Sequence, residues 1–309
     1  MAAFLELTIE RAVAGGRMLA RHEGQIVFVQ GAIPGERVRA RIERRQKQVL
    51  FAETVEVLEP SADRRTPVCD LACGGSAYAH IADARQRQLK GEIIADAFAR
   101  IAKAPLPATP PVAASPAAGY RMRARVHVEG ARWGFYREGT HTLCDAGSTQ
   151  QLQGDACAAI DAFVAAHGSV AAKLAAITIS ENIAATERVL VLEARDGAGA
   201  LACEGASAGL SGVTDANGRV LWGSGWVSDT AAAMWNDAAP IDPAIQWRRR
   251  ATSFFQGNRY LVGALVSEVL RATEGARRVI DLYAGGGLFS LALAARGASV
   301  IAVEMDGSI

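Results

Sequence analysis

The sequence predicts a multidomain protein of mixed α+β and α/β class, with an N-terminal OB-like β-barrel, a central β-rich domain and the start of a Rossmann-like domain. Short alternating strands broken by Gly and Pro over residues 4–58 predict the barrel. The Rossmann-like part is predicted from residues 279–309, where a glycine turn separates an apolar strand from an apolar helix. The predicted parts are residues 1–60, 61–110, 111–245 and 246–309.

Composition limits the classes of function. The chain has 309 residues, 50% of them hydrophobic and 6% aromatic, which is typical of a globular protein with roughly two or three domains. No apolar run reaches the roughly 18 residues that a membrane helix needs, and the N-terminus lacks a basic region followed by an apolar core. We therefore expect a cytoplasmic protein without membrane contact. Since the net charge is +1, polyanion binding would depend on local basic patches.

One candidate patch lies in the predicted barrel. Basic residues alternate with apolar ones along VRARIERRQK, so a strand would carry the basic side chains on one face. Small β-barrels with a basic strand are frequent nucleic-acid modules. The alternative is an ordinary solvated face, because basic residues exceed acidic ones only modestly over residues 1–68. The residues of the patch are Arg37, Arg39 and Arg41, extended by Arg44, Arg45 and Lys47.

The same stretch resembles a known domain. GGRMLARHEGQIVFVQGAIPGERVRARI is similar to the TRAM domain, an RNA-binding barrel, over most of residues 5–58, and PGERV after an apolar strand is the most specific part. The resemblance implies RNA as the partner. By itself it suits RNA methyltransferases and methylthiotransferases equally, so the rest of the chain has to distinguish them.

The five cysteines are Cys69, Cys73, Cys144, Cys157 and Cys203. They are irregularly spaced in a large, apparently intracellular chain, which favours free thiols or the remnant of a metal site over disulfides.

The segment PVCDLACGGSAYAH resembles the stretch that binds a 4Fe-4S cluster in TRAM-bearing uracil-5 RNA methyltransferases. Cys69, Cys73 and His80 match that stretch in kind, whereas Ser76 occupies the third ligand position and Thr149 the fourth. Iron-sulfur clusters are normally held by four thiolates. We therefore expect no cluster and no metal ligands here, with Cys144 as the one residue that could supply a third thiolate.

A helix is predicted over residues 82–102, followed by a Pro/Ala-rich linker and a hairpin, YRMRARVHVEGARWGFYREGTH. The hairpin resembles strands of the central β domain of the same family, which implies contacts with an RNA backbone. The alternative is a charged outer strand of a half-buried sheet. The hairpin's candidate contacts are Arg121, Arg123, Arg125, Arg132, Arg137 and His141.

The glycine turn near the end of the chain points to a nucleotide cofactor. A dinucleotide fingerprint requires GxGxxG, and although Gly285 and Gly287 match, the third position is Ser290, which weakens an NAD interpretation. S-adenosylmethionine has no pyrophosphate and needs only the backbone that the turn exposes, while Glu304 at the end of the second strand can bind the ribose hydroxyls. The alternative is a glycine turn in an unrelated α/β domain.

The motif FFQGN lies just ahead of this unit, in a loop that leads into an amphipathic helix. FFQxN resembles a signature of the uracil-5 RNA methyltransferases, in which the Gln reaches S-adenosylmethionine. Where that family usually has Asn after the last glycine, this chain has Leu288. The resemblance implies as cofactor contacts Gln256, Tyr283 and Glu304, together with the turn glycines Gly285 and Gly287.

Together these resemblances cover nearly the whole chain and imply methylation of C5 of a uridine in rRNA or tRNA. A cysteine thiolate would add to C6, C5 would take the methyl group, and a base would remove the C5 proton. The family's nucleophile lies in later strands, and this chain has no cysteine beyond Cys203. We therefore predict no catalytic residue, and expect a C-terminally truncated, monomeric fragment that is inactive alone.

Two alternatives stay open. One is a stand-alone RNA-binding protein with a vestigial methyltransferase fold. The other is a nicotinamide-dependent oxidoreductase, against which the FFQGN loop and Ser290 argue.

Overall fold

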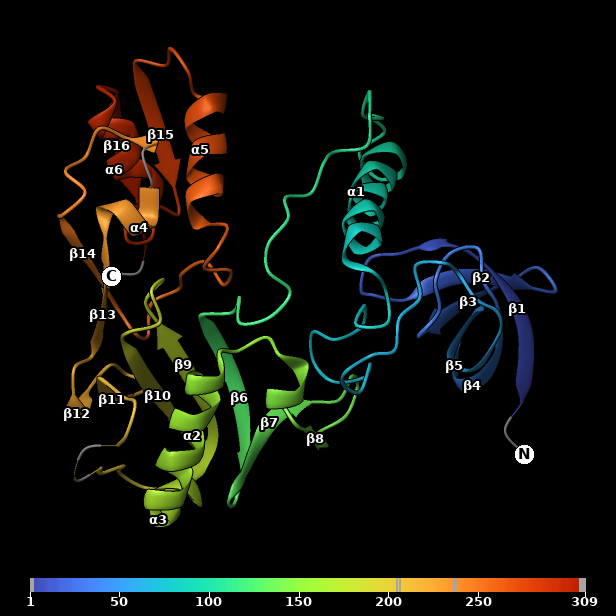
Figure 1. Cartoon of the computed structure of the whole chain (residues 1–309), viewed down its shortest axis with the longest axis horizontal. Coiled ribbons are helices and arrows are strands. Elements are labelled where there is room, and N and C mark those ends of the chain that lie inside the picture. The colour runs from blue at the N-terminus through green and yellow to red at the C-terminus, as the bar shows by residue number, and fades with distance from the viewer. Residues whose placement is uncertain (1–2, 204, 206, 236–237, 306–309) are drawn as a thin grey trace. The chain divides into compact units, whose positions relative to one another are not determined.

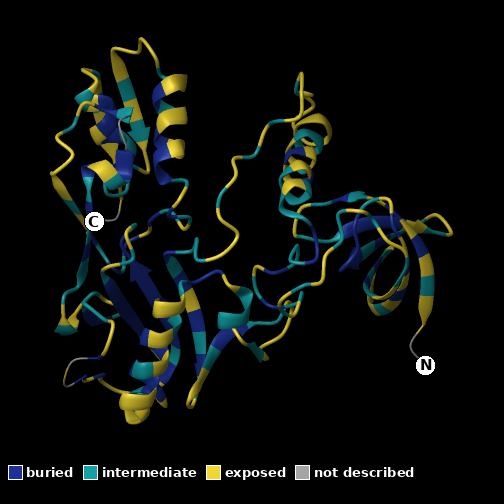
Figure 2. Ribbon diagram, viewed as in Figure 1, coloured by how far each residue is buried: buried dark blue, intermediate teal, exposed yellow. Residues whose placement is uncertain are grey.

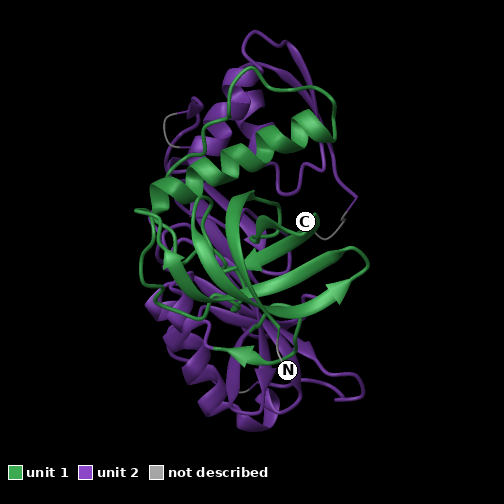
Figure 3. Ribbon diagram, turned by 90° about the vertical axis from the view of Figure 1, so that its right-hand side faces the viewer, with its two compact units in different colours: residues 1–114, 136–144 green, residues 115–135, 145–309 purple. Residues whose placement is uncertain are grey.

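The computed structural model describes residues 3–203, 205, 207–235 and 238–305. The chain forms two compact units, coloured separately in Figure 3. Unit 1 comprises residues 1–114 and 136–144, and unit 2 comprises residues 115–135 and 145–309. Among the described helices, none combines the length and the apolar character needed to cross a membrane.

Unit 1 contains the predicted closed barrel, with strand order β1-β2-β3-β5-β4 (Figure 1). All neighbouring strands are antiparallel except β3 and β5, which run parallel. Gly15 and Gly16, both with positive φ, form the turn between the first two strands, as the sequence predicts. The strands are β1 (Phe4–Ala12), β2 (Met18–His22), β3 (Gln25–Gln30), β4 (Arg37–Gln46) and β5 (Val49–Glu59).

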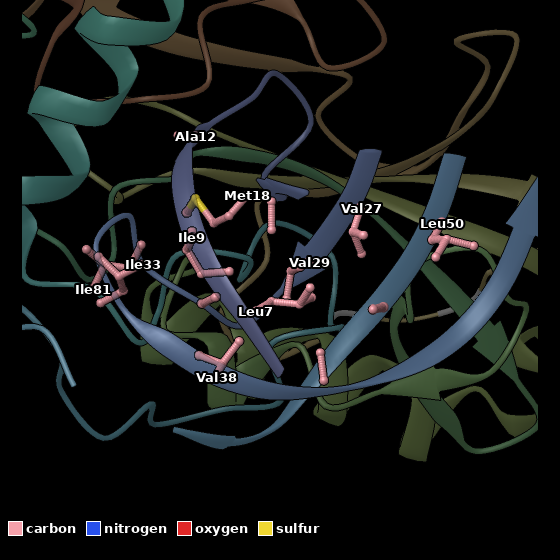
Figure 4. Close-up of a cluster of buried hydrophobic side chains, with 14 of the residues drawn as sticks. Leu7, Ile9, Ala12, Met18, Val27, Val29, Ile33, Val38, Leu50 and Ile81 are labelled. Carbon is pink, nitrogen blue, oxygen red and sulfur yellow. The ribbon is translucent and has the colours of Figure 1, made fainter. Parts of the chain in front are cut away.

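The barrel closes around apolar side chains that alternate along the strands. Figure 4 shows Leu7 and Ile9 of β1, Val27 and Val29 of β3, and Val38 of β4 among the residues of this core, and each is at most 2% exposed. This period-two pattern is what closes a small barrel around a filled interior. The helix predicted over residues 82–102 is α1 (Asp83–Arg100), which contributes Leu89 to the same core.

The first part of unit 2 is a mixed sheet with strand order β12-β11-β10-β9-β6-β7. The central strands β9 and β10 are largely buried (Figure 2), in agreement with their continuous apolar sequences. This stretch of the chain also contains β8 (Leu143–Cys144), which belongs to unit 1, and a short 3-10 helix, η1 (Gly147–Thr149). The sheet strands and following helices are β6 (Arg123–Glu129), β7 (Arg132–Tyr136), β9 (Leu174–Glu181), β10 (Arg188–Ala194), β11 (Gly212–Asp215), β12 (Val220–Gly223), α2 (Gly154–Ala166) and α3 (Gly168–Ala171).

The rest of unit 2 contains the predicted strand, glycine turn, helix and strand. β15 and β16 pair in parallel, with Ile280 opposite Ile301, and α6 connects them. Buried residues of the helices α4, α5 and α6, including Trp235, Val266 and Leu293, form one hydrophobic core that packs against β15 and β16. The elements are β13 (Trp226–Thr230), α4 (Ala231–Trp235), β14 (Gln246–Arg250), α5 (Val262–Ala272), β15 (Arg278–Leu282), α6 (Leu288–Ala295) and β16 (Ser299–Val303).

Candidate cofactor site

The turn between β15 and α6 is built on left-handed backbone. Gly285 and Gly287 have φ of +54° and +83°, and Tyr283 has +60°, which is uncommon for a residue with a side chain. The backbone amide of Gly285 donates to Oε2 of Glu304 at 2.8 Å, so the acid at the end of β16 is tied to the turn. Tyr283 is 85% exposed. Four of the five predicted cofactor contacts therefore lie together beyond the carboxyl ends of β15 and β16, where α/β sheets bind their ligands.

Two tryptophans that no sequence motif indicated support this turn. Trp247 of β14 donates from Nε1 to the carbonyl of Gly286 at 2.9 Å, and Trp235 of α4 donates to the carbonyl of Leu288 at 2.8 Å. A Cβ atom on Gly286 would lie 2.4 Å from Cζ2 of Trp247, so this position requires glycine. Leu288 is itself buried in the core of unit 2, which explains why an apolar residue stands there.

The third position of the dinucleotide pattern has a different role here. Ser290 is 8% exposed, and its hydroxyl donates to Oδ2 of Asp281 in β15 at 2.6 Å. The third glycine of the pattern serves close packing of helix on strand. In this chain a side-chain hydrogen bond joins α6 to β15 instead, which agrees with the weakened NAD interpretation.

The FFQGN loop is connected to the turn through Trp247. The ring of Phe255 lies 5.4 Å from that of Trp247, centroid to centroid, and Trp247 in turn binds Gly286. The carbonyl of Gly257 accepts the amide of Met122 at 2.9 Å, which anchors the loop to the strand segment before β6. Gln256 is half-buried, and among the described residues none forms a hydrogen bond with its side chain. Its amide group is therefore available to a ligand.

A buried charge cluster holds the residue that follows this loop. Glu181, at the end of β9, is fully buried, and its Oε1 accepts a hydrogen bond from Nε of Arg188 at 2.6 Å. Its Oε2 accepts from Nη2 of Arg259, whose Nη1 also donates to the carbonyl of Ile183 at 3.0 Å. Arg259 comes directly after Asn258, so the cluster fixes the end of the motif to the central sheet. In the sequence, the only sign of this charge cluster was Glu181, the lone acid that ends the stretch AITISE.

A second buried pair lies beside the first. Oδ2 of Asp229 lies 3.9 Å from Nη2 of Arg249, and Oδ1 accepts the amide of Ile183 at 2.6 Å. Burial lowers the pKa of Arg249 to about 10 and raises the pKa of Asp229 above its usual value. These residues join β14 to the end of β9, so the support of the site runs through the interior of unit 2.

Three arginines of the basic patch predicted on the barrel are paired with acids. The predicted face is real, because the alternate arginines of β4 are exposed, but β5 places a glutamate near each of them. Arg44 instead lies over the ring of Phe51, 3.9 Å from its centroid. The sequence could not show this pairing, because it depends on strand register. The ion pairs are Arg37–Glu59 at 2.9 Å, Arg39–Glu56 at 2.9 Å and Arg41–Glu53 at 2.7 Å.

The hairpin arginines also have protein partners. Arg123 donates to the carbonyls of Ser253 and Thr252 at 3.2 and 3.1 Å, and burial lowers its pKa. Arg125 pairs with Glu193 at 2.7 Å. Arg123 thus ties β6 to the segment before the FFQGN loop, and its contact with an RNA backbone stays a prediction.

The cysteine segment of unit 1 contains a disulfide, contrary to the expectation of free thiols. Cys73 is bonded to Cys144, with 5.8 Å between their Cα atoms. His80 is 1% exposed and donates from Nε2 to the carbonyl of Ala32 at 2.9 Å, and burial lowers its pKa. Ser76 is buried as well. These residues do not fit a 4Fe-4S cluster, and in the described part of the chain no three His, Cys, Asp or Glu side chains are placed to hold a metal ion.

Free thiols remain at Cys69, Cys157 and Cys203. Burial, with Asp161 nearby, raises the pKa of Cys157 to about 11, and burial raises that of Cys203. Reactive cysteines need a lowered pKa, so neither thiol has the environment of a nucleophile.

Comparison with known proteins finds similarity to a TRAM domain and to RNA methyltransferases. The TRAM domain family matches residues 4–55. The 23S rRNA (uracil(1939)-C(5))-methyltransferase RlmD of Thiobacillus denitrificans is 31% identical over 314 residues, covering 94% of this chain and 70% of the relative. The protein of the same description from Azoarcus sp. is 30% identical over 313 residues, with the same coverages.

A solved structure has the same fold. The tRNA (uracil-54, C5)-methyltransferase of Pyrococcus abyssi, in complex with S-adenosyl-L-homocysteine, aligns with a TM-score of 0.64 and 18% identity. The alignment covers 97% of this chain and 73% of that one. It confirms the predicted fold class.

Proposed function

The chain belongs to the family of the 23S rRNA (uracil-C5)-methyltransferases, and from this premise we propose that it serves the S-adenosylmethionine-dependent methylation of C5 of a uridine in ribosomal or transfer RNA. The observation that carries the proposal is the bond between the amide of Gly285 and the carboxylate of Glu304. This bond holds the acid at the end of β16 against the glycine turn, which supports the proposal of a site for a nucleoside with a free ribose.

We propose that the cofactor contacts are Gln256, Tyr283, Gly285, Gly287 and Glu304. Oε1 and Oε2 of Glu304 can accept hydrogen bonds from ribose hydroxyls, and the half-buried amide of Gln256 can bind a polar group of the cofactor. When bound, S-adenosylmethionine supplies an electrophilic methyl group. The chain's own residues bind and orient it, and Trp247 fixes the turn near which all of them except Gln256 lie.

We assign the nucleophile to none of the five cysteines, all of which lie ahead of the proposed domain 246–309. Cys73 and Cys144 are bonded to each other, and the thiols of Cys157 and Cys203 have raised pKa values. Uracil C5 becomes a competent nucleophile only after a thiolate has added to C6. The lack of a cysteine suited to be the nucleophile also favours a second candidate, a stand-alone RNA-binding protein with a vestigial methyltransferase fold. Such a protein would bind no S-adenosylmethionine.

Several further assignments belong to this proposal. We propose the four parts 1–60, 61–110, 111–245 and 246–309 as its domains, a cytoplasmic location and a monomeric state. RNA is the proposed partner, because a TRAM domain is combined with a methyltransferase fold.

Titration of the purified chain with S-adenosylmethionine tests the proposal. We expect saturable binding that NAD does not displace, and a loss of affinity of roughly tenfold or more in Glu304→Ala and in Gln256→Ala, since hydrogen bonds to a charged group contribute about 1.5–3 kcal/mol. Glu268→Ala is the control, because Glu268 is exposed on α5 and binds only Arg271 among the described residues. Absence of binding, or equal affinities in all variants, would contradict the proposal, and absence of binding would favour the second candidate.

A further inference from the structure

The ribbon of β13 and β14 has one buried and one outward face. The antiparallel register places Trp226 opposite Arg250 and Ser228 opposite Arg248. These four side chains belong to the outward set, whereas Val227, Asp229 and Arg249 are buried. The outward face therefore presents a tryptophan beside two arginines and a serine.

The two outward arginines are held against the tryptophan. Cζ of Arg250 lies 4.8 Å and Cζ of Arg248 lies 5.3 Å from the centroid of the Trp226 ring, both within cation-π range. Two positive charges at one aromatic ring repel each other, so this arrangement concentrates charge on a small surface.

No carboxylate neutralises this pair in the part of the chain that the structure describes. No Asp or Glu oxygen lies within 4.0 Å of Arg248 or Arg250, whereas Arg39 on the barrel and Arg125 in the central sheet each have a glutamate partner. Glu187, which directly precedes β10, uses its Oε2 to accept the backbone amide of Ser228 at 2.7 Å. The ribbon thus has a positive charge that is not offset by an ion pair, unlike the charges of Arg39 and Arg125.

We propose that Trp226, Arg248 and Arg250 form a binding site for single-stranded RNA, in which a base stacks on the indole or on a guanidinium plane and the arginines bind the adjacent phosphates. Stacking on aromatic side chains within a positive groove is how proteins hold single strands without reading their sequence. Charge complementarity favours a polyanion over a protein partner, whose interface would need more apolar area than one ring.

The opposite face of the same ribbon supports the cofactor site. Trp247 lies opposite the buried Asp229 in the register, and its indole donates to the carbonyl of Gly286. RNA held on one face of β13 and β14 would therefore lie on the two strands that brace the glycine turn. The inference rests on the proposed function in one respect, namely that RNA is the substrate of the protein.

The test measures binding of a short single-stranded RNA that contains 4-thiouridine. We expect Trp226→Ala to weaken affinity by about 5- to 100-fold, the range typical of one stacked base, and Trp226→Phe to retain most of it. Arg248→Ala combined with Arg250→Ala is expected to reduce the slope of log affinity against log salt by about 1.4, at about 0.7 for each phosphate contact. Photocrosslinks should map to the peptide that contains Trp226.

Two matched controls come from the same unit. Trp133→Ala removes a tryptophan that donates to Asp161, and Arg271→Ala removes an exposed arginine that is paired with Glu268, so neither should change the affinity. The proposal is overturned if the triple variant of Trp226, Arg248 and Arg250 binds RNA as the wild type does, or if the crosslinks map elsewhere. An unchanged affinity would leave a protein partner as the occupant of this face.

Titration with S-adenosylmethionine separates this test from that of the proposed function. If the cofactor fails to bind while the crosslinks map to Trp226, the methyltransferase proposal fails and the RNA site stands. If the cofactor binds while the triple variant keeps its RNA affinity, the RNA site fails alone. Cofactor affinity in the ribbon variants also reports whether unit 2 is still folded.

Discussion

Glu181→Ala is expected to lower the free energy of unfolding of unit 2 by about 3–5 kcal/mol, because removal of one partner leaves buried charges without compensation. The change leaves the guanidinium groups of Arg188 and Arg259 buried, at 7% and 4% exposure, without their shared carboxylate. Urea unfolding followed by tryptophan fluorescence measures the effect. The same variant should bind S-adenosylmethionine more weakly, since Arg259 ends the FFQGN loop.

Glu193→Ala provides the matched control. Glu193 also pairs with an arginine, Arg125, but both side chains are partly exposed, and such pairs contribute about 0–1 kcal/mol. Equal effects of the two substitutions would mean that the buried cluster has no special part in holding the loop.

Gly286→Ala is expected to have the second largest effect. The new Cβ would lie 2.4 Å from the rigid indole of Trp247, and overpacking of this kind typically costs about 1–3 kcal/mol. Displacement of Trp247 would also break its hydrogen bond to the turn, so affinity for S-adenosylmethionine should fall roughly tenfold, for a loss of about 1.4 kcal/mol. Thermal unfolding measures the expected loss of stability, and titration with S-adenosylmethionine measures the expected loss of affinity.

Gly168→Ala is the control for this substitution, since a Cβ there meets no atom within 4 Å and the residue begins the helix α3. Adding Trp247→Ala to the Gly286→Ala variant should restore part of the lost stability by making room. If the single variant unfolds and binds cofactor as the wild type does, the contact between Trp247 and the turn does not matter.

The sequence predicted those features that depend on local patterns. Alternation along the first strands predicted the barrel, and the glycines at 285 and 287 predicted the turn that has positive φ at both. The fold class was confirmed by the solved structure of the tRNA methyltransferase. The choice of Gln256 and Tyr283 as cofactor contacts stays a prediction, because their role depends on a ligand.

Features that depend on pairing across the fold could not be predicted. The arginines of β4 were visible in the sequence, but the glutamates that neutralise them belong to β5, and only the register brings them together. The contact of Trp247 with Gly286 joins residues 39 positions apart, and that of Glu181 with Arg259 joins residues 78 positions apart. The bond between Cys73 and Cys144 spans 71 positions, which irregular cysteine spacing cannot indicate.

The most direct test of the central claim is a profile of 5-methyluridine in the ribosomal and transfer RNA of cells that lack the gene. The account predicts that one 5-methyluridine disappears from one of these RNAs, that the gene restores it, and that the gene carrying Glu304→Ala does not. An unchanged profile in the deletion strain would contradict the account, as would full restoration by the Glu304→Ala gene.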